Sequence, residues 1–165
     1  MPKTCFVIAP IGDEKSSTRD RSDKVLRHLI APVLAGHGYE APVRADHIAS
    51  PGMITSQVIQ HLVDDDMVIA DLSAANPNVY YELAVRHMVR RPLVQIIEKG
   101  EPIPFDVAGS RTIVFDHHDL DSVESARTHL SRQLQAAERD AGSVDNPISI
   151  ALDLKALRSS SDPVQ

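Results

Sequence analysis

Short apolar runs alternate along the chain with longer segments in which apolar residues recur every three or four positions. The short runs are rich in valine and isoleucine, which is typical of strands in a parallel sheet that is buried on both faces. The longer segments have the periodicity of amphipathic helices. We predict strands at residues 4–11, 39–47, 67–72, 92–98 and 111–115. Helices are predicted between and after them, at residues 22–36, 54–63, 77–90 and 121–141.

This alternation of strands and helices predicts an α/β fold with right-handed crossovers, flavodoxin-like or Rossmann-like. Five strands suit a flavodoxin-like three-layer sandwich with a mostly parallel sheet in the order 2-1-3-4-5. In that order the switch point lies between the first and third strands, where ligands bind beyond the carboxyl ends. Residues 12–21, interpreted as a loop, and the turn that begins the helix at Pro77 are expected to face each other there.

Three residues add detail to the predicted helices and strands. Ser22 is a plausible N-cap for the first helix. Pro32 lies inside that helix and is expected to kink or split it, because proline has no amide hydrogen to donate. Pro42 suits an edge position for the second strand for the same reason.

The length of 165 residues predicts one main domain, residues 1–142. Asn146 and Pro147 then favour the start of a short helix over residues 143–158, packed on the domain or on a partner. Residues 159–165 are expected to be disordered.

Charge and composition narrow the classes of partner. The formal net charge is −6 and no basic stripe is present, so nonspecific binding to a nucleic-acid backbone is not expected. No apolar run approaches the ~20 residues that span a membrane, so no membrane association is expected. Cys5 is the single cysteine and can form no internal disulfide, which suits a reducing compartment. The expected location is therefore the cytoplasm.

The candidate chemistry lies in residues 67–88, where a buried strand ends in a carboxylate and a helix follows. Asn76 and Pro77 form a good helix start, and Glu82 is the sixth helical residue. Asn78 and Glu82 are four residues apart and share one helix face, which can look into the switch-point cleft. A carboxylate there can act as a nucleophile or a general base, and Asp71 is the natural second acid.

A structural alternative exists for each of these two acids. Glu82 has Arg86 four residues further on, in the favourable orientation for a surface ion pair. Asp71 can equally cap a neighbouring turn. From the residues alone, both interpretations remain open.

Several charged residues near the expected cleft are further candidates. Arg19, Arg21 and Arg44 could bind phosphate, although Arg19 and Arg21 also suit solvated loop positions. Asp46 could hold a ribose hydroxyl, because acidic residues at the end of a second strand do so in dinucleotide folds.

The densest group of potential metal ligands spans residues 116–119, with the sequence DHHD. Adjacent histidines on a strand point to opposite faces and do not chelate together easily. We interpret the segment as a plain turn, and no metal site and no cofactor is predicted.

The segment DLSAANPNVYYELAVRH, with FVIAPIG near the start and RAD at residues 44–46, resembles nucleoside 2-deoxyribosyltransferase-like proteins. The resemblance covers about residues 4–100 and implies a flavodoxin-like fold whose site is related to that of TIR-type NAD-cleaving domains. In that family a glutamate on the helix after the third strand attacks the anomeric carbon, and Glu82 matches it. The family's enzymes carry an aspartate six residues earlier; here that position is Asn76, which can bind but cannot ionise.

The resemblance implies cleavage of the N-glycosidic bond of a nucleoside, nucleotide or NAD+, by a hydrolase or a glycosyl transferase. A second hypothesis is a module that senses a nucleotide in the same cleft without turnover. A third is an assembly domain that uses the terminal helix, and a homo-oligomer fits all three. Of Tyr80 and Tyr81, at most one can face the site, because adjacent helical residues point about 100° apart. The expected substrate-binding residues are Pro10, Gly12, Arg19, Arg44, Asp46, Ser73, Asn76, Asn78 and Tyr81, with Glu82 and Asp71 catalytic.

Overall fold

The computed structural model describes residues 2–50, 53–104, 111–141 and 146–161. Five parallel strands form one sheet in the order β2-β1-β3-β4-β5, which confirms the predicted fold class and strand order. The strands are β1 (Cys5–Ile8), β2 (Val43–Arg44), β3 (Met67–Asp71), β4 (Leu93–Glu98) and β5 (Ile113–Phe115).

The sheet is buried on both faces, as its aliphatic strands predict. Along β1, Cys5 and Val7 pack into one core cluster, whereas Phe6 and Ile8 pack into the other. This alternation follows from the two-residue period of a strand. All five residues of β3, the central strand, are buried.

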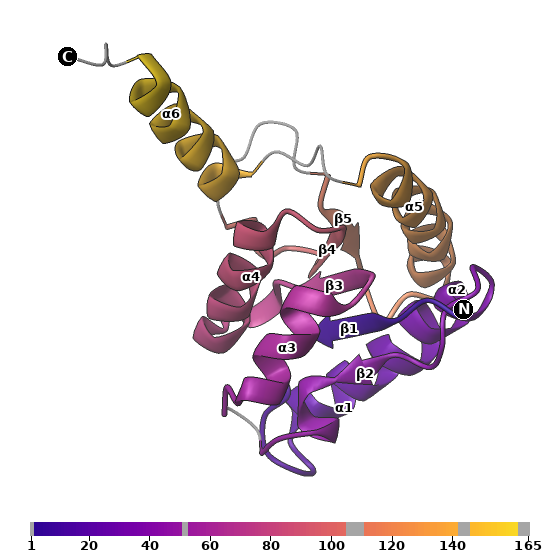
Figure 1. The fold of residues 1–165 in the computed structure, drawn as a ribbon. Helices are drawn as coiled ribbons and strands as arrows, with labels where there is room; N and C mark the ends of the chain where they lie inside the picture. Colours follow the sequence, from indigo (N-terminus) through magenta and orange to yellow (C-terminus); the bar gives the residue numbers. More distant parts are fainter. Residues whose placement is uncertain (1, 51–52, 105–110, 142–145, 162–165) are drawn as a thin grey trace.

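Helices cover the two faces of the sheet and make a three-layer structure (Figure 1). One layer holds a long helical stretch and α5 (Leu120–Arg139), whose apolar residues join the core cluster of Cys5. The stretch consists of α1 (Ser17–Lys24), a π-helical segment (Val25–Ile30) and α2 (Ala31–Ala35). The other layer holds α3 (Ser56–Asp64) and α4 (Pro77–Val89), which pack on the cluster of Phe6.

The first helix begins earlier than predicted. Ser16, not Ser22, is its N-cap, and its hydroxyl accepts a hydrogen bond from the Arg19 amide at 3.1 Å. The first two turns are almost entirely polar, so apolar periodicity gave no sign of them. Much of residues 12–21 is therefore helix rather than loop. The disturbance expected from Pro32 takes the form of the π-helical segment that ends at Ile30.

The second strand is shorter than predicted. Only Val43 and Arg44 pair with β1, at the edge of the sheet. Pro42, which comes immediately before, cannot donate to a strand ladder. A single 3-10 turn, Ala45–His47, follows and contacts β1.

The terminal helix α6 (Pro147–Ser161) extends three residues beyond its predicted end, through residues that were expected to be disordered. Residues 162–165 and the start of the predicted segment lie outside the described residues. The Asn146 side chain donates to the His87 carbonyl at 3.0 Å, and Arg90 donates to the Ser149 carbonyl at 3.0 Å. These bonds dock the beginning of α6 on α4, and the rest of α6 projects from the domain (Figure 1).

Among the described residues, no helix combines the length and the apolar character needed to cross a membrane.

Candidate active site

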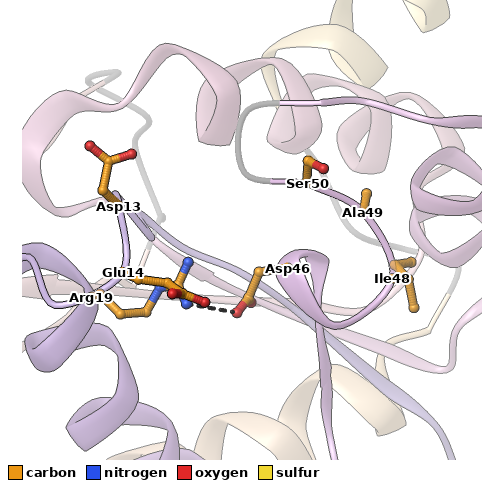
Figure 2. A pocket seen from close by; sticks show the side chains of 7 residues that line it. All are labelled: Asp13, Glu14, Arg19, Asp46, Ile48, Ala49 and Ser50. Carbon is orange, nitrogen blue, oxygen red and sulfur yellow. Dashed lines mark ion pairs between the residues drawn. The ribbon is translucent and has the colours of Figure 1, made fainter.

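Two adjoining hollows lie where the chain leaves β1 and β2 and enters α4. The outer one has a volume of about 710 Å³, and the inner one about 30 Å³. The outer hollow is lined by Asp13, Glu14, Arg19, Asp46, Ile48, Ala49 and Ser50 (Figure 2). The inner hollow is lined by Ala9, Ile11, Ala45, Asp46, Ser50, Met53, Ile54, Asn76, Asn78 and Glu82. They share Asp46 and Ser50, so together they form one site at the predicted switch point.

The two hollows differ in the size of molecule that each can hold. The outer hollow falls within the ~300–1,000 Å³ range of small-molecule sites, and its volume is about 710 Å³. The inner hollow, at about 30 Å³, has room for little more than one water molecule. The outer hollow thus has room for a small molecule, and it borders the inner hollow at Asp46 and Ser50.

Glu82 lies in the second turn of α4 and is 6% exposed. Its Oε2 atom has no hydrogen-bond partner among the described residues. Burial raises the pKa of Glu82 to about 7, because a desolvated carboxyl group favours its neutral form. The pKa of the carboxyl group thus lies near neutral pH, and the group faces the inner hollow.

The alternative ion pair between Glu82 and Arg86 does not form. Arg86 is fully buried and donates instead to the backbone carbonyls of Leu62, Asp65 and Pro92, at 2.8–3.2 Å. These bonds tie the end of α3 to the start of β4. The local sequence contained no sign of them, because two of the three carbonyls come from another helix and turn.

Asn78 lies beside Glu82 in the inner hollow, as the helix face that these two residues share predicted, and Asn76 lines the same hollow. The Asn76 side-chain oxygen accepts hydrogen bonds from the amides of Asn78 at 2.9 Å and Val79 at 3.3 Å. Asn76 is thus the predicted N-cap of α4. Its side-chain amide group remains as a donor toward the hollow.

Asp46 is held in place by Arg44. Arg44 is 3% exposed, and its Nε and Nη2 atoms bind the two Asp46 oxygens at 2.5 and 2.9 Å. Burial disfavours the Asp46 charge, but the hydrogen bonds and charge of Arg44 outweigh it and lower the pKa of Asp46. Nη1 of Arg44 donates to the Ser22 hydroxyl, and Nη2 also donates to Asp23. Arg44 is therefore enclosed and is a positioning residue for Asp46, not the expected phosphate ligand.

Arg19 lies on α1 and lines the outer hollow. Its Nη2 atom donates to the Gly12 carbonyl at 3.1 Å, and its Nη1 atom lies 3.8 Å from the Asp46 carboxylate (Figure 2). The side chain is 18% exposed, so its interpretation as a solvated loop charge was wrong. Gly12 has a φ angle of +68°, and a Cβ atom there would lie 2.8 Å from the Ser16 hydroxyl.

Asp71 belongs to a different cluster. It is fully buried, and its carboxylate lies 2.8 Å from Arg21 Nη1 and accepts hydrogen bonds from Ser73. Arg21 also pairs with Glu98 at 3.0 Å, so it is no solvated loop charge either. None of these residues lines either hollow. The structure thus separates Asp71 and Ser73 from Glu82, and their contacts favour a structural role.

The remaining predicted residues lie around the site rather than in it. Tyr81 is 57% exposed and lines neither hollow, whereas Tyr80 packs against the core. Pro10 is buried and lines neither hollow, whereas its neighbours Ala9 and Ile11 line the inner one. Sequence reasoning missed the residues that follow β2, although their position at the carboxyl edge was a usable signal: Ile48, Ala49 and Ser50.

The histidine cluster after β5 lies in a turn, as interpreted from the sequence. The rings of His117 and His118 are 3.8 Å apart, so the opposite faces of a strand do not describe them. Potential ligand atoms of Glu98, Asp116 and His117 lie within 4.8 Å of one another. The Glu98 oxygens, however, already accept from His117 and Arg21, and a metal ion would have to displace both.

The buried Glu82 predicts a specific dependence of stability on pH. Its folded-state pKa of about 7 lies above the ordinary 4.5, so the folded state retains a proton that the unfolded state has lost. The contribution of the Glu82 carboxyl group to the free energy of unfolding is complete below about pH 4.5, and it is lost as the pH rises to about 7. The total loss is about 3 kcal/mol by linkage, from the shift between 4.5 and about 7.

Glu82→Gln cannot titrate and should lack this loss. Urea unfolding of both proteins across this pH range gives the free energy of unfolding at each pH. The variant is expected to gain about 3 kcal/mol relative to wild type between the acidic and the basic limit. If the free energy of unfolding changed with pH in the same way in both proteins, Glu82 would have an ordinary pKa.

No protein-family model matches the chain, and no curated protein matches it either. Among solved structures, the chain is similar to CMP N-glycosidase BcmB of Clostridium botulinum, with a TM-score of 0.52 and 11% sequence identity. The match covers 77% of this chain and 99% of the other. At this identity the similarity shows a shared fold, and the strand order above agrees with a flavodoxin-like arrangement.

Proposed function

We propose that this protein cleaves the N-glycosidic bond of a nucleoside-type ligand, with Glu82 as the nucleophile. The observation that carries the proposal is the Glu82 carboxyl group, which is buried, lacks a partner at Oε2 and faces the inner hollow, and this hollow adjoins the outer one of ligand size. A buried polar atom without a partner costs free energy, and such groups concentrate at functional sites. The shared fold with a CMP N-glycosidase supports the same class of reaction.

The first step exchanges one bond at the sugar for another. A Glu82 oxygen bonds to the anomeric carbon, the bond from that carbon to the base nitrogen breaks, and its electron pair leaves with the base. Positive charge develops on the sugar in the transition state, and the carboxylate beneath it stabilises that charge. In the second step, water or a second base attacks the anomeric carbon and releases Glu82.

The residues around Glu82 support this step by orientation. Asp46, fixed by Arg44 and kept ionised, can accept a hydrogen bond from a sugar hydroxyl. The amides of Asn76 and Asn78 flank the carboxyl group and offer donors to the ligand. A neutral base also needs a proton as it leaves. Asp71, ion-paired with Arg21, is poorly placed for that role, so a water in the outer hollow is the better donor.

A chromatographic screen for released base tests the proposal. Purified protein is incubated with ribonucleosides, 2′-deoxynucleosides, their 5′-monophosphates and NAD+, and both base and sugar are quantified. Equimolar release of the two identifies a hydrolase; release that depends on an added second base identifies a transferase. Folded, concentrated protein that releases base from none of these compounds would contradict the proposal.

One observation favours a second candidate, a sensor that binds a nucleotide in this site without turnover. Asn76, at the position of the family's aspartate, cannot ionise, and its oxygen is occupied as the N-cap. Calorimetry distinguishes the two functions. A sensor gives saturable binding, and the ligand is recovered unchanged after long incubation with wild-type protein.

A further inference from the structure

The turn between β3 and α4 contains two consecutive alanines in the left-handed region of backbone conformation. Ala74 has a φ angle of 64°, and Ala75 has one of 47°. This region favours glycine, because the β-carbon of any other residue crowds the neighbouring backbone there. Asparagine and aspartate tolerate it through local hydrogen bonds, which an alanine side chain cannot make. Both alanine side chains are exposed, so their own packing does not impose this strained conformation.

Ser73, which precedes the two alanines, fixes the start of the turn. It is 2% exposed, and its hydroxyl donates to the Asp71 carboxylate at 2.6 Å. The same oxygen accepts hydrogen bonds from Arg21 Nη2 at 2.8 Å and from the Glu98 amide at 2.9 Å. One hydroxyl group thus ties the turn to β3, to α1 and to β4.

Glu101 fixes the turn from the side of β4. Its Oε2 atom accepts a hydrogen bond from the Ala74 amide at 2.7 Å. The chain turns back just after β4, where the Glu101 amide donates to the Glu98 carbonyl at 3.3 Å and Gly100 has a φ angle of 90°. Contacts on both sides therefore hold the alanines in a conformation that they rarely adopt.

The residue after this turn, Asn76, begins the helix that carries Glu82. Asn76, Asn78 and Glu82 all line the inner hollow, so the end of the turn lies directly beside the start of the site. Alanine at positive φ has fewer accessible conformations than glycine. A turn with two alanines is therefore stiffer than the turn with two glycines that would relieve the strain.

We infer that Ala74, Ala75 and Glu101 are positioning residues: the strained turn holds the start of α4 where its buried carboxylate can reach the anomeric carbon. The inference rests on the proposed function and adds to it residues that do not touch the ligand. None of the residues that line the outer hollow belongs to the turn or to α4. Loosening the turn should therefore slow the chemical step more than it weakens ligand binding.

Glycine at both alanine positions separates positioning from stability. Ala74→Gly with Ala75→Gly relieves the strain, so the melting temperature should rise by roughly 2–6 °C, even though glycine is freer in the unfolded chain. The same variant should lower kcat for base release about tenfold or more and change KM less than about threefold. A purely structural turn would not give a protein that is more stable but slower. A lower melting temperature, or a kcat within about twofold of wild type, overturns the inference.

Lys15→Gly is the matched control for relief of strain. Lys15 also has a φ angle of 64°, is exposed and lines neither hollow. This variant should raise the melting temperature by roughly 1–3 °C and leave kcat unchanged. A loss of kcat equal to that of the double glycine variant would overturn the inference.

Two substitutions of Glu101 test the hydrogen bond to the Ala74 amide. Glu101→Ala removes the acceptor, whereas Glu101→Gln keeps a side-chain oxygen, and both remove the same charge. We expect kcat to fall several-fold in Glu101→Ala and to stay close to the wild-type value in Glu101→Gln. Equal kcat values for the two variants would overturn the assignment of Glu101 as a positioning residue.

Failure of the proposed function has a different signature. If wild-type protein releases base from none of the screened compounds, the proposed function fails and this inference fails with it. If wild-type protein releases base and the double glycine variant matches its kcat, the function stands and the inference alone is overturned.

Discussion

Glu82→Gln should release base from the active substrate at least about a thousandfold more slowly than wild type, equivalent to about 4 kcal/mol of transition-state stabilisation. The amide matches the carboxyl group in size but is neither a nucleophile nor a carrier of negative charge. Oε2 of Glu82 bonds to no described residue, so the substitution leaves no partner of that atom unpaired and the fold should remain intact. Initial rates by chromatography, with thermal unfolding as the check on folding, measure the effect.

Two further variants define the role of this side chain. Glu124→Gln, on the exposed side of α5, should retain the wild-type rate. Glu82→Asp keeps the charge but withdraws it by one methylene, so an intermediate rate is expected. For a nucleophile with a pKa near 7, the wild-type rate should rise with pH and level off above about 7. A Glu82→Gln rate within tenfold of wild type would exclude Glu82 as the nucleophile.

Arg21→Met should lower the free energy of unfolding by roughly 3–5 kcal/mol, because it leaves a buried charge without its counter-ion. Asp71 is fully buried, and its Oδ2 atom pairs with Arg21 at 2.8 Å. The same guanidinium binds Glu98 at 3.0 Å and thereby joins α1 to the ends of β3 and β4. Methionine keeps much of the apolar stem, so the loss reports the charge rather than the packing. Urea unfolding at neutral pH measures it.

The pairing itself is tested by a double variant. Asp71→Asn removes the charge that Arg21→Met leaves without a counter-ion. The double variant should therefore lose less free energy of unfolding than the two single variants lose together. Arg27→Met, an exposed arginine on the same helical stretch, should change the stability by less than about 0.5 kcal/mol. A loss of under about 1 kcal/mol for Arg21→Met would show that the ion pair contributes little.

The central strands and the start of α4 could be predicted from the sequence because the patterns that indicate them lie within a few neighbouring residues. The Val and Ile runs that became β1, β3 and β4 are buried on both faces, and a buried run needs no distant partner to be identified. Asn76 and Pro77 form a helix start whose cap is completed within three residues. The spacing of Asn78 and Glu82 therefore sufficed to place both in the inner hollow.

The contacts that sequence reasoning missed join residues far apart in the chain. Arg21 meets Asp71 across 50 residues and Glu98 across 77, and neither local spacing nor composition reports such a pair. Arg44 appeared to be free for a ligand because its partner Ser22 lies 22 residues away. The polar start of α1 carries no apolar stripe, so only its serine cap signals the helix.

The unpartnered Glu82 carboxyl group also has an evolutionary consequence. It lowers the stability of the folded chain at neutral and higher pH, so a neutral side chain of similar size would be an improvement in any lineage that no longer needs the reaction. Mutation and selection for stability should then replace this glutamate quickly. Its retention across divergent descendants of the same ancestor would therefore record continued selection for the chemistry, independently of any assay.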